Sequence, residues 1–176
     1  MNLFGPVTRA VALAGVLLAA GAAPAFAGPA EMAVLEAYIG TWNGKGTLSG
    51  AQTETVVCKM SLTKGNGTKL NYTGRCSLAG AQLSVTGTIA YVDANKRYEA
   101  VMNSGIGDFR GVAIGQKKGD GVVFDLKQRG VDDSGNDMQI ASTVTLSGGN
   151  KMAVTFNAKF VSTGDTIDAN VPFSKS

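Results

Sequence analysis

Apolar and polar residues alternate along most of this chain from residue 41 onward. In one stretch Phe124 and Leu126 alternate with Asp125 and Lys127. Successive side chains of a β-strand point to opposite faces, so this pattern predicts strands with one dry face and one wet face. The apolar positions continue through Ile140, Val144, Leu146, Met152, Val154, Phe156, Phe160, Ile167, Val171 and Phe173.

Turn sequences interrupt the alternation about every ten residues, which predicts about ten strands. Glycine, asparagine, aspartate or serine, which suit tight turns, occur in each of these stretches. They lie at residues 48–50, 65–67, 79–80, 93–95, 105–107, 119–121, 133–136, 148–150 and 163–165. The intervals are too short for crossover helices, so the strands form an antiparallel meander. We expect an all-β fold closed into a barrel, because closure removes exposed edges. A two-sheet sandwich would alternate similarly, but short hairpin connections favour the barrel.

The first 27 residues have the order of a cleavable signal peptide. Arg9 precedes an apolar run at residues 10–23, and the small residues Ala25 and Ala27 follow. That order predicts cleavage after Ala27 and export to the periplasm or the medium of a bacterium. A membrane anchor is the alternative, but the run is shorter than the roughly 20 residues that span a bilayer. Residues 28–176 then form a single domain, large enough to fold around its own core.

A short helix is expected at the start of this domain. Pro29 suits a first helical turn, and Met32, Leu35 and Ile39 recur at helical spacing. The pattern stops at Gly40.

The two cysteines, Cys58 and Cys76, are predicted to form a disulfide. A hairpin centred on residues 65–67 places them opposite each other on adjacent strands, where disulfide spacing can be met. In an exported chain a bridge is more common than a metal site. A reactive thiol would need a nearby base or helix end, and the sequence indicates neither.

The chain contains no histidine, which excludes histidine-ligated zinc or haem and the common Ser-His and Cys-His catalytic systems. No catalytic motif is recognisable, so we expect neither an enzyme nor a bound cofactor or metal. Of 16 basic and 13 acidic residues only Arg9 lies in the predicted leader, which leaves a net charge of +2. This weak, spread charge does not indicate nucleic-acid binding. The acids Asp132, Asp133 and Asp137 match no calcium loop and are interpreted as a solvated turn.

The segment Gly40-Thr41-Trp42 resembles the Gly-x-Trp opening of the calycins, the superfamily of lipocalins and fatty-acid-binding proteins. The helix before it and the hairpin from Tyr91 to Tyr98 are most similar to the nitrobindin-like branch, which includes exported barrels of unknown function. The resemblance implies that Trp42 plugs the closed end of the barrel, with Gly40 as a structural partner. Nitrobindins hold haem through a histidine, so haem binding does not carry over to this chain.

Three residues are candidates for ligand binding. If Val112 and Ile114 point inward, alternation turns Arg110 inward as well, where it would need an anionic partner. Fatty-acid-binding relatives use inward arginines in that way. In the alternative register Phe109, Gly111 and Ala113 face inward and Arg110 lies in solvent. The hydroxyls of Tyr72 and Tyr98, with Tyr91, could line a cavity mouth, or these rings could be ordinary packing partners.

The favoured function is therefore binding of a small apolar or anionic amphipathic molecule by an exported barrel. The alternative is a protein-binding module, such as an exported inhibitor of a protease or lysozyme. An enzyme is the least expected class. No membrane span is predicted once the signal peptide has been removed.

Overall fold

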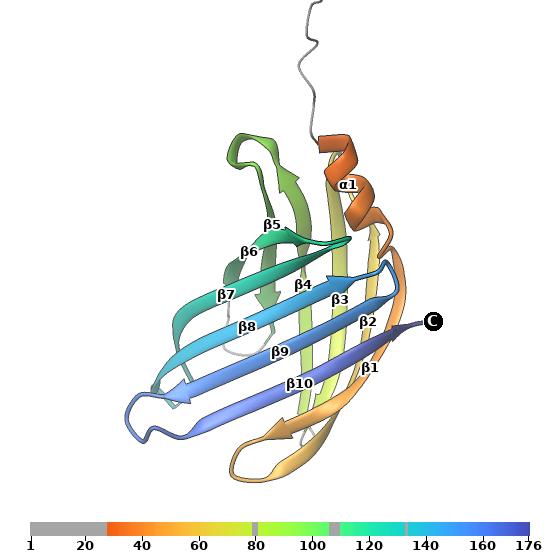
Figure 1. Cartoon of the computed structure of the whole chain (residues 1–176). Coiled ribbons are helices and arrows are strands. Elements are labelled where there is room, and N and C mark those ends of the chain that lie inside the picture. The colour runs from red at the N-terminus through yellow and green to blue at the C-terminus, as the bar shows by residue number, and fades with distance from the viewer. Residues whose placement is uncertain (1–27, 79–80, 106–109, 133) are drawn as a thin grey trace, which may run out of the picture.

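The computed structural model of the protein describes residues 28–78, 81–105, 110–132 and 134–176 (Figure 1). The predicted signal peptide, residues 1–27, lies outside these ranges. Within them, no helix has both the length and the apolar character to cross a membrane.

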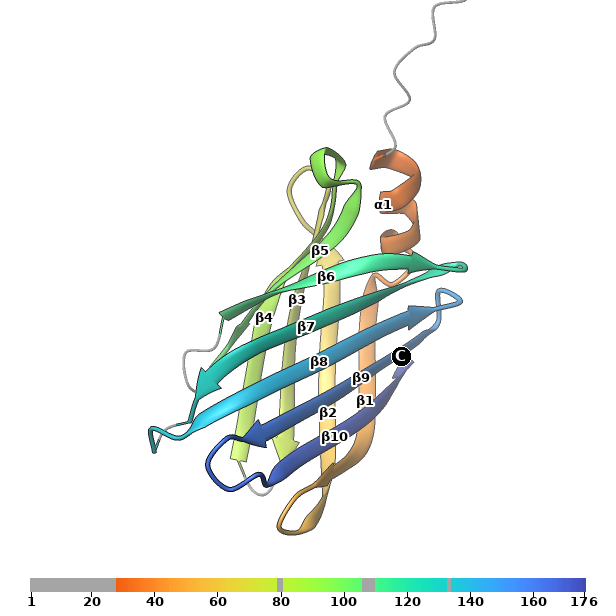
Figure 2. The same cartoon turned by 60° about the vertical axis from the view of Figure 1, so that its left-hand side comes forward.

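Ten antiparallel strands in the described residues form a closed barrel, as the alternation predicts. Each strand pairs with its neighbours in the sequence, and β10 pairs with β1 to complete the ring (Figures 1 and 2). The last residue continues this closure, since the Ser176 amide donates to the Thr41 carbonyl at 2.8 Å. The strands are β1 (Gly40–Ser49), β2 (Thr53–Lys64), β3 (Lys69–Leu78), β4 (Ala81–Val92), β5 (Arg97–Ser104), β6 (Arg110–Lys118), β7 (Gly121–Val131), β8 (Asp137–Ser147), β9 (Lys151–Phe160) and β10 (Thr166–Lys175).

A short helix, α1 (Gly28–Glu36), precedes the barrel and stands at one end of it (Figure 1). It buries Met32 and Leu35 against the strands. The predicted helix is confirmed, but it ends at Glu36, before Gly40. Turn hydrogen bonds from the Tyr38 amide to the Leu35 carbonyl and from the Ile39 amide to the Glu36 carbonyl redirect the chain into β1. Ile39 therefore belongs to the connection.

Trp42 lies fully buried beneath this turn, at the helix end of the barrel. Its Nε1 donates to the Tyr38 carbonyl at 2.9 Å, and its ring stacks on Tyr38 with centroids 6.1 Å apart. Lys175 of β10 places Nζ 5.6 Å from the centroid of the Trp42 ring and donates to the Ala37 carbonyl at 2.9 Å. Gly40 has φ +140°, and a Cβ there would meet Cε of Lys175 at 2.8 Å. These contacts fasten the helix end to both β1 and β10.

The predicted disulfide is confirmed. Cys58 of β2 and Cys76 of β3 are register partners with Cα atoms 4.0 Å apart, and they are bonded through their sulfurs. Cys58 is buried among inward-facing residues, so the bridge lies on the inner side of the wall. It closes a span of 18 residues around the β2–β3 turn.

Replacing both Cys58 and Cys76 by alanine should lower the free energy of unfolding by about 3 kcal/mol, because the bridge restricts the unfolded chain. Urea unfolding of the oxidised protein and of the double variant measures the difference. In the oxidised, folded protein an alkylating reagent should label neither thiol before reduction. Two labelled thiols under those conditions would contradict the bridge.

Candidate functional site

The interior of the barrel has a packed half and a more accessible half. At the helix end the inward side chains are buried, among them Leu62, Leu70, Tyr98, Val122, Phe124 and Leu146. Toward the opposite end many inward side chains keep partial solvent exposure; we call this part the open-half interior. It includes Leu48, Glu54, Leu78, Leu83, Met102, Gln128, Met138, Ser142, Phe156, Ile167 and Ala169. A few inward neighbours, such as Ile140 and Ala158, are buried. Apolar side chains that solvent still reaches can be covered by an apolar ligand.

Glu54 is the charged residue of the open-half interior. It lies two positions before the buried Val56 on β2, so its side chain points to the inner face. Its register partner Leu48 faces the same interior from β1. The Oε2 atom of Glu54 is buried, and no group of the described residues donates a hydrogen bond to it. A buried acceptor without a donor is costly, so this oxygen is a ready partner for a ligand that donates one.

Polar residues on the inner face also include Gln128 of β7 and Ser142 of β8. The Ser142 hydroxyl already donates to the Thr155 carbonyl at 3.1 Å. Glu54 and Gln128 therefore add polar side-chain groups to a surface that is mainly apolar.

Arg110 does not belong to this interior. On β6 the buried residues are Ala113 and Gly115, so the inner face takes the odd-numbered positions and Arg110 lies exposed on the outer face. Val112 on the same outer face is 48% exposed. The inward register of Arg110, Val112 and Ile114 is therefore wrong, and the alternative register, with Gly111 and Ala113 inward, holds. Phe109 lies outside the described residues.

Tyr72 and Tyr98 point inward, but both hydroxyls already have partners. Tyr72 crosses over Gly87 of β4, where a Cβ would meet its hydroxyl oxygen at 2.6 Å, and donates to the Val101 carbonyl of β5 at 3.1 Å. Tyr98 donates to the Glu31 carbonyl of α1 at 3.3 Å. Burial raises the pKa of Tyr72. Both residues therefore have structural roles: their rings pack in the core, and their hydroxyls bond to the backbone of a neighbouring element.

Tyr98 is surrounded on several sides at the helix end. Its ring meets Tyr91 edge-on at 5.1 Å and Phe124 at 6.3 Å between centroids. Burial, followed by the charge of Glu31 and the presence of Tyr91, raises the pKa of Tyr98 to about 12. The hydrogen bond to α1 therefore depends on a phenol that stays neutral over a wide pH range.

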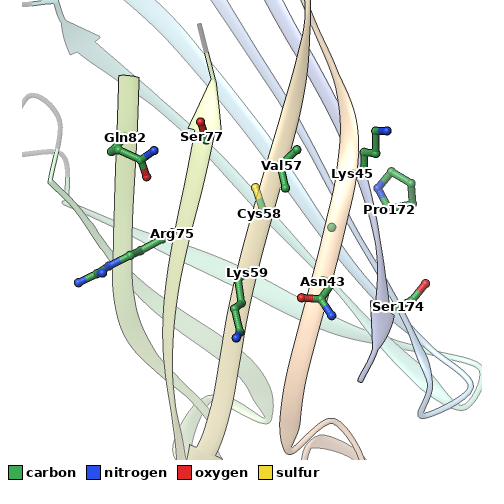
Figure 3. A pocket seen from close by; sticks show the side chains of 11 residues that line it. Asn43, Lys45, Val57, Cys58, Lys59, Arg75, Ser77, Gln82, Pro172 and Ser174 are labelled. Carbon is green, nitrogen blue, oxygen red and sulfur yellow. The ribbon is translucent and has the colours of Figure 1, made fainter. Parts of the chain in front are cut away.

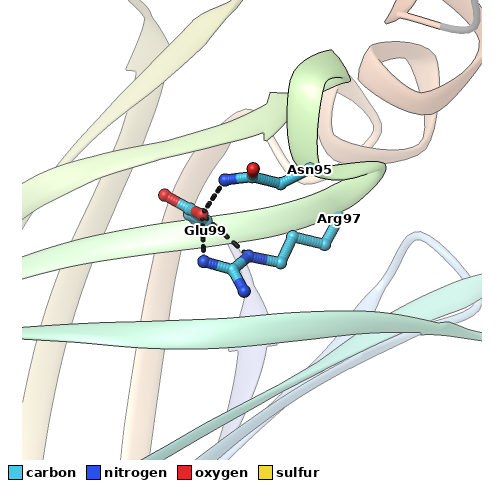
Figure 4. Close-up of polar contacts among 3 residues, drawn as sticks. All are labelled: Asn95, Arg97 and Glu99. Atoms are coloured by element: carbon cyan, nitrogen blue, oxygen red, sulfur yellow. Dashed lines mark hydrogen bonds and ion pairs between the residues drawn. The ribbon is translucent and has the colours of Figure 1, made fainter.

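The hairpin that carries Tyr98 is held on its outer side by a three-residue polar cluster (Figure 4). Glu99 accepts from Nε of Arg97 at 2.8 Å and from Nδ2 of Asn95 at 3.1 Å, and Nη2 of Arg97 lies 2.7 Å from the same carboxylate. The hydrogen bonds from Arg97 and Asn95 lower the pKa of Glu99. All three contacts reach the same oxygen, Oε1 of Glu99, and all come from its own hairpin, so the cluster has a structural role.

The acidic turn after β7 is likewise occupied by its own chain. Asp132 accepts from the amides of Ser134 and Asn136 at 2.9 and 2.7 Å and from Nδ2 of Asn136 at 2.8 Å. These hydrogen bonds, led by those from Asn136, lower the pKa of Asp132. In the part of the chain that the structure describes, no group of three acidic or cysteine side chains could hold a metal ion.

Sequence reasoning missed Glu54 and Gln128, although the signal was present. Glu54 has the parity of Val56 and Cys58, and Gln128 has that of Phe124 and Leu126. Extending each apolar series by one position would have predicted that both polar side chains point inward. A polar residue that continues an apolar parity at a strand end is thus a useful marker of a barrel opening.

Comparison with known proteins gives a fold but no family. The sequence matches no protein-family profile and no curated protein. Rv2717c from M. tuberculosis has a similar structure at TM-score 0.64 and 13% identity, covering 82% of this chain and 96% of that one. The S-type phycobiliprotein lyase CPES from Guillardia theta is similar at TM-score 0.55 and 9% identity, over 85% of this chain and 93% of that one. At these identities the likeness extends to the barrel architecture alone.

Replacing Tyr98 by phenylalanine should flatten the alkaline loss of stability. An unfolded tyrosine ionises near pH 10, whereas the folded pKa is about 12. The stabilisation by the neutral phenol is therefore complete below pH 10 and is lost as the pH rises through 12. At pH 7 the free energy of unfolding of the variant should be about 1 kcal/mol lower than that of the original protein, because the hydrogen bond is lost. This difference between the two proteins should narrow above pH 10. Urea unfolding between pH 7 and pH 12 measures the free energy of unfolding of both proteins. If that free energy depends on pH in the same way in both, the prediction is wrong.

Proposed function

We propose that this protein is an exported barrel that binds a small apolar or amphipathic molecule in its open-half interior, and that it acts as a binding protein rather than an enzyme. The observation that carries the proposal is the contrast between the two halves. Bulky aromatic residues fill the helix end, while inward apolar side chains at the other end stay partly exposed. Barrels of this size have room for one small ligand.

Membership of the calycin superfamily is part of this proposal. Two independent features support it: the Gly40-Thr41-Trp42 opening, and a closed antiparallel barrel whose helix end is plugged by Trp42. The likeness to Rv2717c and to the lyase supports the architecture.

The polar chemistry of the interior favours a ligand that donates hydrogen bonds or carries positive charge. With Arg110 on the outer face, the inner face offers Glu54 with an unpartnered carboxylate oxygen. An anionic amphipath would be repelled by that carboxylate, whereas an amine would satisfy it. We therefore replace the anionic ligand of the sequence prediction by an apolar molecule with a donor group.

Filling the interior should abolish binding of an apolar probe. Ala169 of β10 points inward and is partly exposed, and the next residue, Asn170, is exposed on the outer face. Replacing Ala169 by tryptophan should weaken binding of the fluorophore 1-aminoanthracene at least tenfold, because the indole would occupy the same space. The Asn170→Trp variant is the matched control and should bind like the original protein. Fluorescence titration measures both, with melting temperatures to confirm folding.

A second comparison tests the role of Glu54 in the same experiment. Glu54→Leu should lose roughly tenfold in affinity for 1-aminoanthracene, the value of one hydrogen bond to a charged acceptor. Affinity for anthracene, which lacks the amine, should be unchanged or higher. Equal losses for both probes would reject Glu54 as the anchor. If the original protein binds neither probe, the interior is not a ligand site and the protein-binding alternative becomes the better proposal.

Export is proposed from the leader pattern, and the Cys58–Cys76 disulfide is compatible with it. Protein recovered from the periplasm of a bacterium that expresses the full chain should begin at Gly28. N-terminal sequencing measures this, and a chain that keeps residues 1–27 in that fraction would overturn the proposal.

A further inference from the structure

The outer surface of the barrel carries a hollow that is separate from the interior (Figure 3). It has a volume of about 620 Å³, within the range of small-molecule sites. Side chains from five adjacent strands surround it, because β10 and β1 meet there after ring closure. The lining residues that matter here are Lys45, Val57, Lys59, Arg75, Ser77, Gln82 and Pro172.

The hollow lies in a positively charged region of the surface. Its charged lining residues are Lys45, Lys59 and Arg75, all basic and all exposed. Between residues 40 and 92 the sequence contains a single acid, Glu54, and that side chain faces inward. The outer faces of β1 to β4 thus present cations without a neighbouring carboxylate.

Lys59 and Arg75 lie directly opposite each other across β2 and β3. Like charges at such positions repel and destabilise a sheet. Among the described residues neither side chain forms an ion pair. The adjacent Cys58–Cys76 disulfide holds this register from the inner side of the wall. An anion bound between the two side chains would turn this repulsion into attraction.

In the part of the chain that the structure describes, the acids on the outer faces of the flanking strands form no ion pair with these cations. Asp168 of β10 accepts a hydrogen bond from Nδ2 of Asn157 at 2.7 Å. Glu99 of β5 is held by Arg97 and Asn95. Within the described residues, no side-chain carboxylate is therefore paired with the basic lining of the hollow.

We propose that this hollow binds the phosphate group of a small molecule. The guanidinium of Arg75 matches a phosphate with two parallel hydrogen bonds, and Lys59 adds a second positive charge. Ser77 and Gln82 stand on the same side and can donate further hydrogen bonds (Figure 3). Val57, 52% exposed at the centre of β2, offers an apolar contact for the rest of the ligand. The site is thus built for a phosphate ester with an apolar part.

Calorimetry with phenyl phosphate, and with phenol as the uncharged comparison, tests this proposal. The exported protein should bind phenyl phosphate and not phenol. Arg75→Gln and Lys59→Gln should each weaken binding at least tenfold. Arg129→Gln is the matched control, because Arg129 is exposed on β7, away from the hollow, and it should leave affinity unchanged. An equal loss in the Arg129 variant, or no binding by the original protein, would overturn the proposal.

Thermal melting is a second measurement. It shows whether Lys59 and Arg75 destabilise the folded protein by repulsion or stabilise it. Without phosphate and at low salt, Lys59→Gln should raise the melting temperature by roughly 1–3 °C, because it removes the repulsion. Phenyl phosphate should then stabilise the original protein but neither variant. A lower melting temperature in both Lys59→Gln and Arg75→Gln without phosphate would show that the pair is structural and would reject the site.

Two more measurements distinguish the hollow from a lipid-binding surface and from the barrel interior. Sedimentation with phosphatidylglycerol vesicles tests a membrane source of the phosphate, and binding to vesicles but not to phenyl phosphate would overturn the small-molecule proposal. The Ala169→Trp variant should bind phenyl phosphate normally, because its side chain faces the interior. A failure of the interior site would therefore leave this result unaffected.

Discussion

Closure of the sheet into a ring is the constraint on which the rest of this structure depends. Once β10 pairs with β1, every strand residue must face either the enclosed interior or the outside. The plug at the helix end, the partly exposed inward residues at the other end and the basic outer hollow all follow from that division. A single strand shows it clearly, since β2 turns Glu54 and Cys58 inward and Lys59 outward.

The strands and the disulfide could be predicted because their determinants are local. Strong alternation fixes the faces of β7 to β10, and one tight turn aligns Cys58 with Cys76. The orientation of Arg110 stayed open between two registers because β6 has no such contrast. Its small residues face inward, where a Cβ at Gly115 would meet the Phe124 ring at 2.5 Å, and its bulky Val112 faces outward. The space left by large side chains of the adjacent strand β7 decides which β6 residues face inward, and hydrophobicity does not.

The candidate sites were harder to predict because each depends on distant parts of the chain. Glu54 could have been turned inward by parity, but its unpartnered oxygen follows only from the packing around it. The outer hollow joins Lys45 to Pro172, residues from the first and last strands. Acidic residues are scarce between residues 40 and 92, and the alternation turns the one acid there, Glu54, inward, so that the outer faces of β1 to β4 keep cations alone.

The pairing of the last strand with the first has a consequence for the order of folding. Nine of the ten strand pairs join neighbours in the chain and can form from short hairpins as the polypeptide lengthens. The tenth needs residues Thr166–Lys175, and until they arrive β1 and β9 are open edges that can pair with other molecules. Loss of β10 alone would therefore leave two open edges and a lasting tendency to aggregate.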